Sequence, residues 1–217
     1  MRIQADGVSI RTKRGLVFDD VSFSVQPGGV LAVCGSGGSG RTSLLLAMSG
    51  RMRLSEGTLA IDGKRLPGAG PWVRRNSSVC PAPTIDPLVE NMRVSEELRR
   101  AELLAGRRWQ RRLTREALLE LVDFGADQHD LVGDLGPVDQ SKLRLALGMV
   151  AATPLIVLDD LGDQVPASGH EALWNGVRAC AEATGATVVA SSLEPLPARL
   201  VVDTFVALAG AHIAEAA

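Results

Sequence analysis

The stretch VLAVCGSGGSGRTSLLLAMSG, residues 30–50, decides the fold of this chain. It opens with five apolar residues, a run typical of a strand buried on both faces. The glycine-rich segment GSGGSGRTS, residues 35–43, follows at once, and a segment of helical character then runs from Thr42 to Gly50. This order of buried strand, glycine-rich loop and helix predicts a loop whose backbone N–H groups converge on phosphate.

The loop provides most of the candidate ligand-binding residues. Its glycines supply backbone freedom, the helix dipole adds attraction for an anion, and the hydroxyl of Thr42 suits Mg²⁺. Arg41 stands where such loops carry lysine, and because a guanidinium is longer and planar we expect weaker phosphate binding rather than none. The predicted nucleotide-binding residues are Gly35, Ser36, Gly37, Gly38, Ser39, Gly40, Arg41, Thr42 and Ser43.

A second motif, LIVLDD at residues 155–160, ends a predicted buried strand on two carboxylates. The end of such a strand is where a phosphate-loop protein holds Mg²⁺ and orients an attacking water. We therefore predict Thr42 and Asp159 as the metal pair and Asp160 as the catalytic residue. Either motif alone would carry little weight, but the two together are fairly specific.

The remaining pattern indicates a mixed α/β protein. Short alternating segments before a turn at residues 27–29 predict antiparallel strands. The further predicted elements are a hairpin at 57–65, a loop at 66–72, helices at 93–106, 112–125, 142–152 and 170–184, a strand at 186–192 and a final hairpin at 203–216. Leucines at three- and four-residue intervals between residues 90 and 135 indicate a helical subdomain.

Composition narrows the class of protein. The net charge of −2 over 217 residues leaves no basic footprint for nucleic acid, and the locally basic segment 99–115 is expected to be a solvated helix face. Three cysteines without a CxxC pair favour reduced thiols in a cytoplasm. No apolar run reaches the about 18 residues of a membrane span, and the first residues lack a signal-peptide core, so we expect a soluble, cytosolic chain.

The rarer ring-bearing side chains suggest no separate cofactor site. The histidines show no ligand spacing and are expected at the surface or in loops, whereas the tryptophans are expected to be packing anchors. The histidines are His129, His170 and His212, and the tryptophans are Trp72, Trp109 and Trp174.

Taken together, the motifs resemble the nucleotide-binding subunit of ABC transporters over nearly the whole chain. FDDVSFSVQPGG and the glycine loop are similar to the family's first half, and SKLRLALGMVAATPLIVLDDL is similar to the part that leads to its metal-binding strand. Matching Leu135 to the leucine of the LSGGQ signature places Asp159 on the metal-binding aspartate without a gap. The resemblance implies a P-loop NTPase core with an antiparallel β subdomain at residues 1–89 and 139–217, and an inserted α-helical subdomain at 90–138, within one domain of residues 1–217.

The resemblance also implies cofactors and partners. In this family, ATP and Mg²⁺ lie between the phosphate loop of one subunit and the signature of a second, and closure of the dimer drives a membrane permease. We therefore expect a second ABC ATP-binding subunit, identical or different, a transmembrane permease, and a place at the cytoplasmic face of the plasma membrane. No nucleic acid partner is expected.

Several positions depart from the family pattern. The signature serine and glycines become Gly136, Pro137 and Val138; the water-activating glutamate becomes Asp160; the switch histidine becomes Ser192; the glutamine that senses the permease becomes Ala82; and no Trp or Phe lies near Arg11, where an adenine-stacking aromatic is expected. Together these changes predict a retained fold with eroded hydrolytic machinery.

Three functions remain open from the sequence. The first is a catalytically degenerate subunit that binds nucleotide and works in a dimer. The second is a working ATPase in which Arg41 and Asp160 substitute adequately. The third is an interaction module of the same fold that binds no nucleotide.

Overall fold

The fold combines two β-sheets with helices in a computed structural model, which describes residues 1–13, 15–82, 85–106 and 113–209. The larger sheet is parallel, with the strand order β6-β7-β8-β3-β9. Its strands are β3 (Val30–Gly35), β6 (Ser77–Val79), β7 (Leu155–Leu158), β8 (Thr187–Ser192) and β9 (Thr204–Leu208). Because β8 separates β7 from β3, residues that end β8 lie between the glycine loop and the carboxylates that follow β7.

The second sheet is antiparallel and has the order β2-β1-β4-β5, as the sequence predicts for both of its hairpins. Its strands are β1 (Ile3–Thr12), β2 (Gly15–Val25), β4 (Glu56–Ile61) and β5 (Lys64–Arg65). At Gly57 the φ angle is +80°, and a Cβ there would lie 2.2 Å from the carbonyl oxygen of Gly7. Only glycine allows the two strands to approach this closely.

Strand β3 is buried on both faces, as its uninterrupted apolar sequence predicts. Val30, Ala32 and Cys34 face the core that contains the large helices, whereas Leu31 and Val33 face the core shared with the antiparallel sheet. The alternation follows from the two-residue period of a strand. It places the end of β3, and the loop that follows, between two packed layers.

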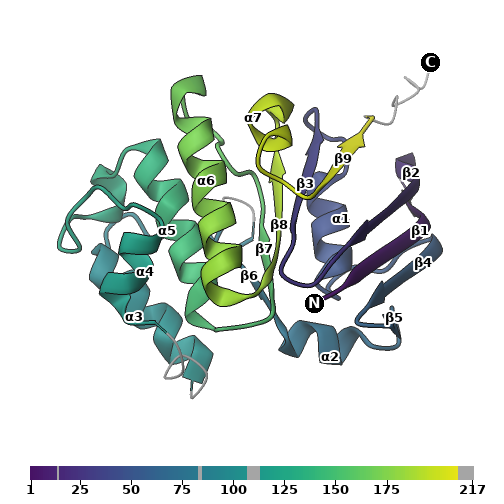
Figure 1. Ribbon diagram of the computed structural model, residues 1–217, viewed down its shortest axis with the longest axis horizontal. Coiled ribbons are helices and arrows are strands. Elements are labelled where there is room, and N and C mark those ends of the chain that lie inside the picture. Colours follow the sequence, from purple (N-terminus) through teal and green to yellow (C-terminus); the bar gives the residue numbers. More distant parts are fainter. Residues whose placement is uncertain (14, 83–84, 107–112, 210–217) are drawn as a thin grey trace.

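Helix α1 (Arg41–Met48) lies between the two sheets (Figure 1). Its buried apolar side chains pack in the core cluster that also holds residues of β1, β4, β7 and β8. Since α1 is packed on both sides, its N-terminus is held fixed at the carboxyl end of the parallel sheet.

The helices on the other side of the parallel sheet form the left part of Figure 1. They are α3 (Val94–Ala105), α4 (Arg115–Leu121), α5 (Pro137–Val150) and α6 (Ala167–Thr184), with the 3₁₀ turn η2 (Val132–Asp134) before α5. Helix α5 packs against α3 and α4 as well as against α6 and β7. It therefore joins the helical part to the parallel sheet and crosses the expected subdomain boundary at residues 138 and 139.

Three local predictions are wrong, and one short strand was missed. Helix α2 (Gly70–Arg75) occupies part of the predicted loop at 66–72. The short strand β6 was not predicted. Strand β9 pairs in parallel with β3 and is not paired as a hairpin strand with any other described segment, while residues 210–216 of that predicted hairpin lie outside the described residues. His170 is neither exposed nor in a loop, because it lies in α6, is buried, and has its Nε2 3.0 Å from the carbonyl oxygen of Val165.

Other expectations about the core are confirmed. All three cysteines are free and buried. Trp174 is 1% exposed and is a packing anchor of the helical core, while Trp109 lies outside the described residues.

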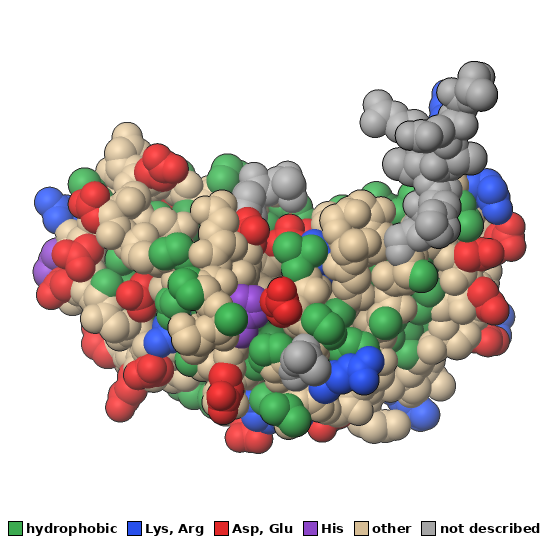
Figure 2. All heavy atoms as spheres, turned by 90° about the horizontal axis from the view of Figure 1, so that it is seen from above, with side chains coloured by type: hydrophobic (Ala, Val, Ile, Leu, Met, Phe, Trp, Pro, Cys, Tyr) green, Lys and Arg blue, Asp and Glu red, His purple; other side chains and the backbone are tan. Residues whose placement is uncertain are grey.

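None of the helices in the described ranges is long and apolar enough to cross a membrane. On the face that carries the carboxyl ends of the parallel strands, acidic side chains predominate over the helical part, which is the left part of Figure 2.

Candidate functional site

The site lies at the carboxyl ends of β3, β8 and β7, where open parallel sheets bind their ligands. The register places Cys34 beside Ser192 and Leu158 beside Ala190, so the residues that leave the three strands meet at one edge. The structure therefore brings the glycine loop and the two carboxylates together, although more than 110 residues separate them in the sequence.

The loop has the backbone conformation of an anion cradle. Gly38 and Gly40 have φ angles of +76° and +92°, and Gly40 caps α1 without a side-chain hydrogen bond. The first N–H groups of α1 have no acceptor within the helix, and no acidic residue lies in its first turn. A Cβ on Gly37 or Gly38 would meet no atom within 4 Å, so the surface above the loop is open.

The predicted loop residues do not all face that opening. Ser36, Gly37 and Gly38 are exposed, whereas Ser39 is fully buried. The hydroxyl of Ser39 finds no hydrogen-bond partner, and it lies 2.5 Å from the position of a Cβ built on Gly35. The backbone N–H of Ser39 donates to the carbonyl oxygen of Ser36 at 3.1 Å, so in this conformation Ser39 offers a phosphate neither its hydroxyl nor its N–H.

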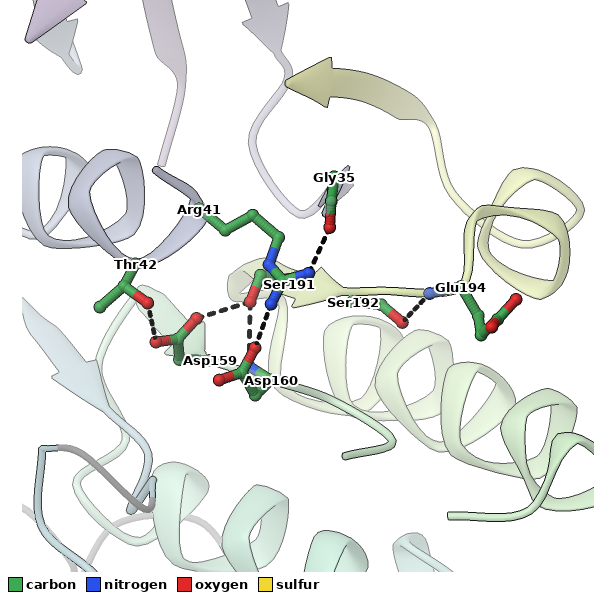
Figure 3. Close-up of polar contacts among 8 residues, drawn as sticks. All are labelled: Gly35, Arg41, Thr42, Asp159, Asp160, Ser191, Ser192 and Glu194. Atoms are coloured by element: carbon green, nitrogen blue, oxygen red, sulfur yellow. Dashed lines mark hydrogen bonds and ion pairs between the residues drawn. The ribbon is translucent and has the colours of Figure 1, made fainter. Parts of the chain in front are cut away.

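The predicted metal pair is in contact. Thr42 Oγ1 donates a hydrogen bond to Asp159 Oδ2 at 2.6 Å, and Ser191 Oγ donates to Asp159 Oδ1 at 2.6 Å (Figure 3). Asp159 is 1% exposed, so both of its oxygens are held by hydroxyls in the protein interior. Ser191 was not among the predicted site residues. It also accepts a hydrogen bond from the backbone N–H of Asp160 at 2.9 Å.

The side chain of Arg41 crosses the mouth of the loop. Its Nη2 donates to Asp160 Oδ1 at 2.7 Å, and its Nη1 donates to the carbonyl oxygen of Gly35 (Figure 3). Burial raises the pKa of Asp160, the neighbouring Asp159 raises it further, and Arg41 lowers it. Asp160 has a φ angle of +51°, a strained conformation for a residue with a side chain, and the bond from its N–H to Ser191 helps to hold it.

A second arginine near this pair was also missed by the sequence analysis. Arg144 lies on α5, and its Nε is buried without a hydrogen-bond partner in the described part of the chain. Burial lowers its pKa, while Asp163 and Asp160 act in the opposite direction. Its position on a mostly apolar helix gave no signal in the sequence.

The residues at the other positions where the family has functional side chains take part in local hydrogen bonding and packing. The hydroxyl of Ser192 accepts a hydrogen bond from the N–H of Glu194 at 3.2 Å, and Ala82 is fully buried. Pro137 is the first residue of α5, so it offers no N–H at that helix N-terminus. Val138 packs inward, because a Cβ on Gly169 would lie 3.0 Å from its Cγ2.

The hairpin register places one aromatic residue, Phe18, one pair away from Arg11. Arg11 is opposite Leu16 in the β1–β2 hairpin, and Phe18 is opposite Ile10. Phe18 is 2% exposed and packs beneath the loop, where a Cβ on Gly40 would lie 2.8 Å from its ring. Folding thus brings an aromatic close to Arg11, but it supports the loop and is not free to stack on a base.

The residues present fit a bound phosphate chain and a divalent cation. The open glycine loop with free helical N–H groups suits phosphate, and one hydroxyl with one carboxylate is a sufficient protein contribution for Mg²⁺ shared with phosphates and water. Within the described residues, no group of three or more His, Cys, Asp or Glu side chains is arranged to hold a metal ion by itself. A metal at this site would therefore depend on the phosphates of its ligand.

Comparison with known proteins identifies the family. The family model described as ABC transporter matches residues 18–161. The chain is 30% identical over 176 residues to the ribose import ATP-binding protein RbsA 1 of Burkholderia ambifaria, a match that covers 74% of this chain and 33% of that protein. It is 26% identical over 158 residues to the retinal-specific phospholipid-transporting ATPase ABCA4 of Bos taurus, covering 72% of this chain and 7% of that protein. The chain belongs to the ABC transporter family, and it spans a third or less of the length of these two relatives.

Solved structures show the same fold. A nucleotide-free ATP-binding cassette from an ABC transporter superposes with a TM-score of 0.76 at 17% identity, covering 96% of this chain and 88% of that one. A bacterial ABC transporter cassette solved as a dimer gives a TM-score of 0.74 at 16% identity, covering 95% and 94%. The predicted fold class, a phosphate-loop α/β core with an antiparallel sheet and a helical part, is confirmed.

Proposed function

We propose that this chain is an ATP-binding subunit of an ABC transporter that binds ATP with Mg²⁺, hydrolyses it poorly, and acts in a dimer on a membrane permease. One observation carries the binding part of this proposal. The hydroxyl of Thr42 and the carboxylate of Asp159 meet at 2.6 Å beside the open glycine loop. This is where a cation bridging to phosphates would be held.

Each part of the site has a role in this proposal. The backbone N–H groups of residues 36–38 and 40–43 hold the phosphates, since that of Ser39 is bonded to Ser36. Thr42 and Asp159 hold Mg²⁺, which would neutralise phosphate charge when bound. Ser191 orients Asp159 through its hydrogen bond at 2.6 Å. Arg41 adds a positive charge next to the loop.

Three observations support weak turnover. Asp160 stands where the family has a glutamate and is one methylene shorter, so its carboxylate falls short of the position that activates water. The hydroxyl of Ser192, at the switch position, is bonded to the N–H of Glu194. Pro137 removes an N–H from the N-terminus of α5, at the signature position where a second subunit's ATP would be contacted.

The proposed assembly follows from the family and from this altered signature. A surface with Pro137 first and Val138 packed inward offers little to a partner's nucleotide. A second ATP-binding subunit with an intact signature would complete the nucleotide site on this chain, whereas two copies of this chain would complete neither. We propose that the dimer acts on the permease at the cytoplasmic face of the membrane.

Thermal unfolding with and without ligand tests the binding proposal. A ligand that binds only the folded state stabilises it by about 2.7 kcal/mol at a concentration of 100 times Kd. For a protein of this size that corresponds to a rise in Tm of roughly 5–10 °C. We expect a rise with ATP and Mg²⁺, and a smaller rise with ATP and EDTA.

Two Thr→Val variants make the test specific. Thr42→Val removes the hydroxyl beside Asp159, and we expect it to abolish the difference between Mg²⁺ and EDTA. Thr204→Val is the matched control. Thr204 begins β9, at the edge of the parallel sheet opposite to the site, and its hydroxyl donates to the carbonyl oxygen of Ser24 at 3.0 Å. The absence of any rise in Tm at millimolar ATP would refute nucleotide binding.

Phosphate release and Tm, measured on the same protein, distinguish the proposed function from two others. The hydrogen-bonded Thr42 and Asp159 are what an active ATPase would need, so phosphate release that depends on Asp159 would establish that function. A module that binds no nucleotide could keep the guanidinium of Arg41 across the loop permanently. A Tm that ATP leaves unchanged would therefore favour such a module. Of the three functions, the degenerate subunit alone predicts ATP binding with little or no phosphate release.

A further inference from the structure

The phosphate loop is already engaged by a side chain of its own protein. Arg41 begins α1, yet its guanidinium turns back over the loop and contacts Gly35 and Asp160 through two different nitrogens (Figure 3). Arg41 is 9% exposed, and its bond to Asp160 Oδ1 measures 2.7 Å. The planar fork of arginine makes this double contact, whereas the single ammonium of lysine presents one compact charge.

Asp160 is held in place to receive this bond. Its N–H is fixed by Ser191 at 2.9 Å, and its φ angle of +51° is retained in spite of the strain. The neighbouring carboxylate of Asp159 is occupied by the two hydroxyls of Thr42 and Ser191. Of the two carboxylates, Asp160 is therefore the one that pairs with the guanidinium of Arg41.

This arrangement gives Asp160 and a ligand phosphate the same partner. Phosphate binds guanidinium groups in the same two-pronged manner as a carboxylate, so Arg41 cannot direct the same N–H group fully to both. We propose that Asp160 competes with the phosphates of the nucleotide for Arg41 and thereby sets the affinity of the loop. The inference rests on the proposed function, since it assumes that the loop is where nucleotide binds.

The proposal assigns Asp160 a role other than activating water. In the free protein it neutralises Arg41 and keeps the guanidinium over the loop. When a phosphate engages Arg41, the bond to Asp160 breaks and the carboxylate is left near Arg144, to which it is electrostatically attracted. Nucleotide affinity is then lower than the loop geometry alone would give, because this ion pair must be broken first.

The test measures binding of ADP and of pyrophosphate in EDTA, by calorimetry and by the rise in Tm. Leaving out Mg²⁺ and the γ-phosphate separates the ion pair from the metal site and from hydrolysis. Asp160→Asn keeps the size of the side chain, and asparagine tolerates a positive φ. The amide oxygen of asparagine can still accept a hydrogen bond from Arg41, but the negative charge of the ion pair is lost. The competing interaction in the free state is therefore weaker, and we expect affinity to rise on the order of tenfold.

A matched control separates the pair from general charge. Asp163 is close enough to affect the pKa of Asp160 and is partly buried, but no bond joins it to Arg41 in the described residues. Asp163→Asn removes one negative charge near the loop, and we expect it to raise affinity by less than about threefold. Equal gains in Asp160→Asn and Asp163→Asn would overturn the proposal.

A second background shows whether Arg41 mediates the effect. Arg41→Gln keeps a long polar side chain without the charge, and in this background Asp160→Asn should give no more than the gain of Asp163→Asn. A tenfold gain that persists without Arg41 would overturn the proposal while leaving nucleotide binding intact. If no variant bound ADP or pyrophosphate in EDTA, this inference would be wrong, whereas the proposed function would be refuted only by an unchanged Tm with ATP and Mg²⁺.

Discussion

Replacing Ser191 by alanine tests the hydrogen-bonded centre of the site. Ser191 Oγ donates to Asp159 at 2.6 Å and accepts from the N–H of Asp160 at 2.9 Å, and the residue is fully buried. The bond to a charged group is worth about 1.5–3 kcal/mol, and the partly buried N–H of Asp160 left without its acceptor costs about 1 kcal/mol more. We expect Ser191→Ala to lower the free energy of unfolding by about 3 kcal/mol, which for this chain length is a fall in Tm of roughly 6–12 °C.

The neighbouring serine is a close control. Ser192 is also fully buried and is the last residue of β8, but its hydroxyl accepts only the weaker hydrogen bond from the N–H of Glu194 at 3.2 Å among the described residues. Ser192→Ala should cost about 0.5–1 kcal/mol. Thermal unfolding of both variants in EDTA provides the comparison. If the two fell in Tm by the same amount, the assignment of Ser191 as the residue that orients Asp159 would be refuted.

Three further predictions concern the fold. Gly57→Ala should lower the free energy of unfolding by about 3 kcal/mol, because the added Cβ would lie 2.2 Å from a carbonyl oxygen. Gly63→Ala is the control, since Gly63 has a φ of +74° with open space around it and should cost only about 1 kcal/mol. Urea unfolding measures both. The hydrogen bond from Arg178 lowers the pKa of Asp203, so the carboxylate stabilises the fold at neutral pH. Asp203→Asn should therefore cost about 0.5 kcal/mol at neutral pH and nothing once the pH has fallen well below about 3.9, the pKa of an aspartate in the unfolded chain. Unfolding measured at several pH values would detect this loss. Burial raises the pKa of Cys34 to about 11, so its thiol should react with a thiol reagent at pH 8 only after unfolding, as timed labelling would reveal.

The sequence was sufficient for the parts of the fold that depend on local pattern. The apolar run before Gly35 and the run before Asp159 predicted buried strands, and their order relative to a glycine loop predicted the site. Strand β6 escaped because three residues are too few for a pattern, and β9 was assigned to a hairpin because its parallel pairing with β3 is a contact of distant segments.

Contacts between distant residues explain what was missed at the site. Arg41 and Asp160 are 119 residues apart, and nothing in either motif indicates that the two side chains meet. Ser191 did leave a signal, since a buried apolar strand that ends in two serines places a hydroxyl at the ligand edge of the sheet. Phe18 could not be placed near Arg11 until the register of the β1–β2 hairpin was known.

Phosphate release by the purified chain, at millimolar ATP and Mg²⁺, tests the central claim most directly. The account predicts a rise in Tm that shows binding, together with a release rate no higher than that of the Asp159→Ala variant. A clear rate that collapses in Asp159→Ala would contradict the account and establish a working ATPase.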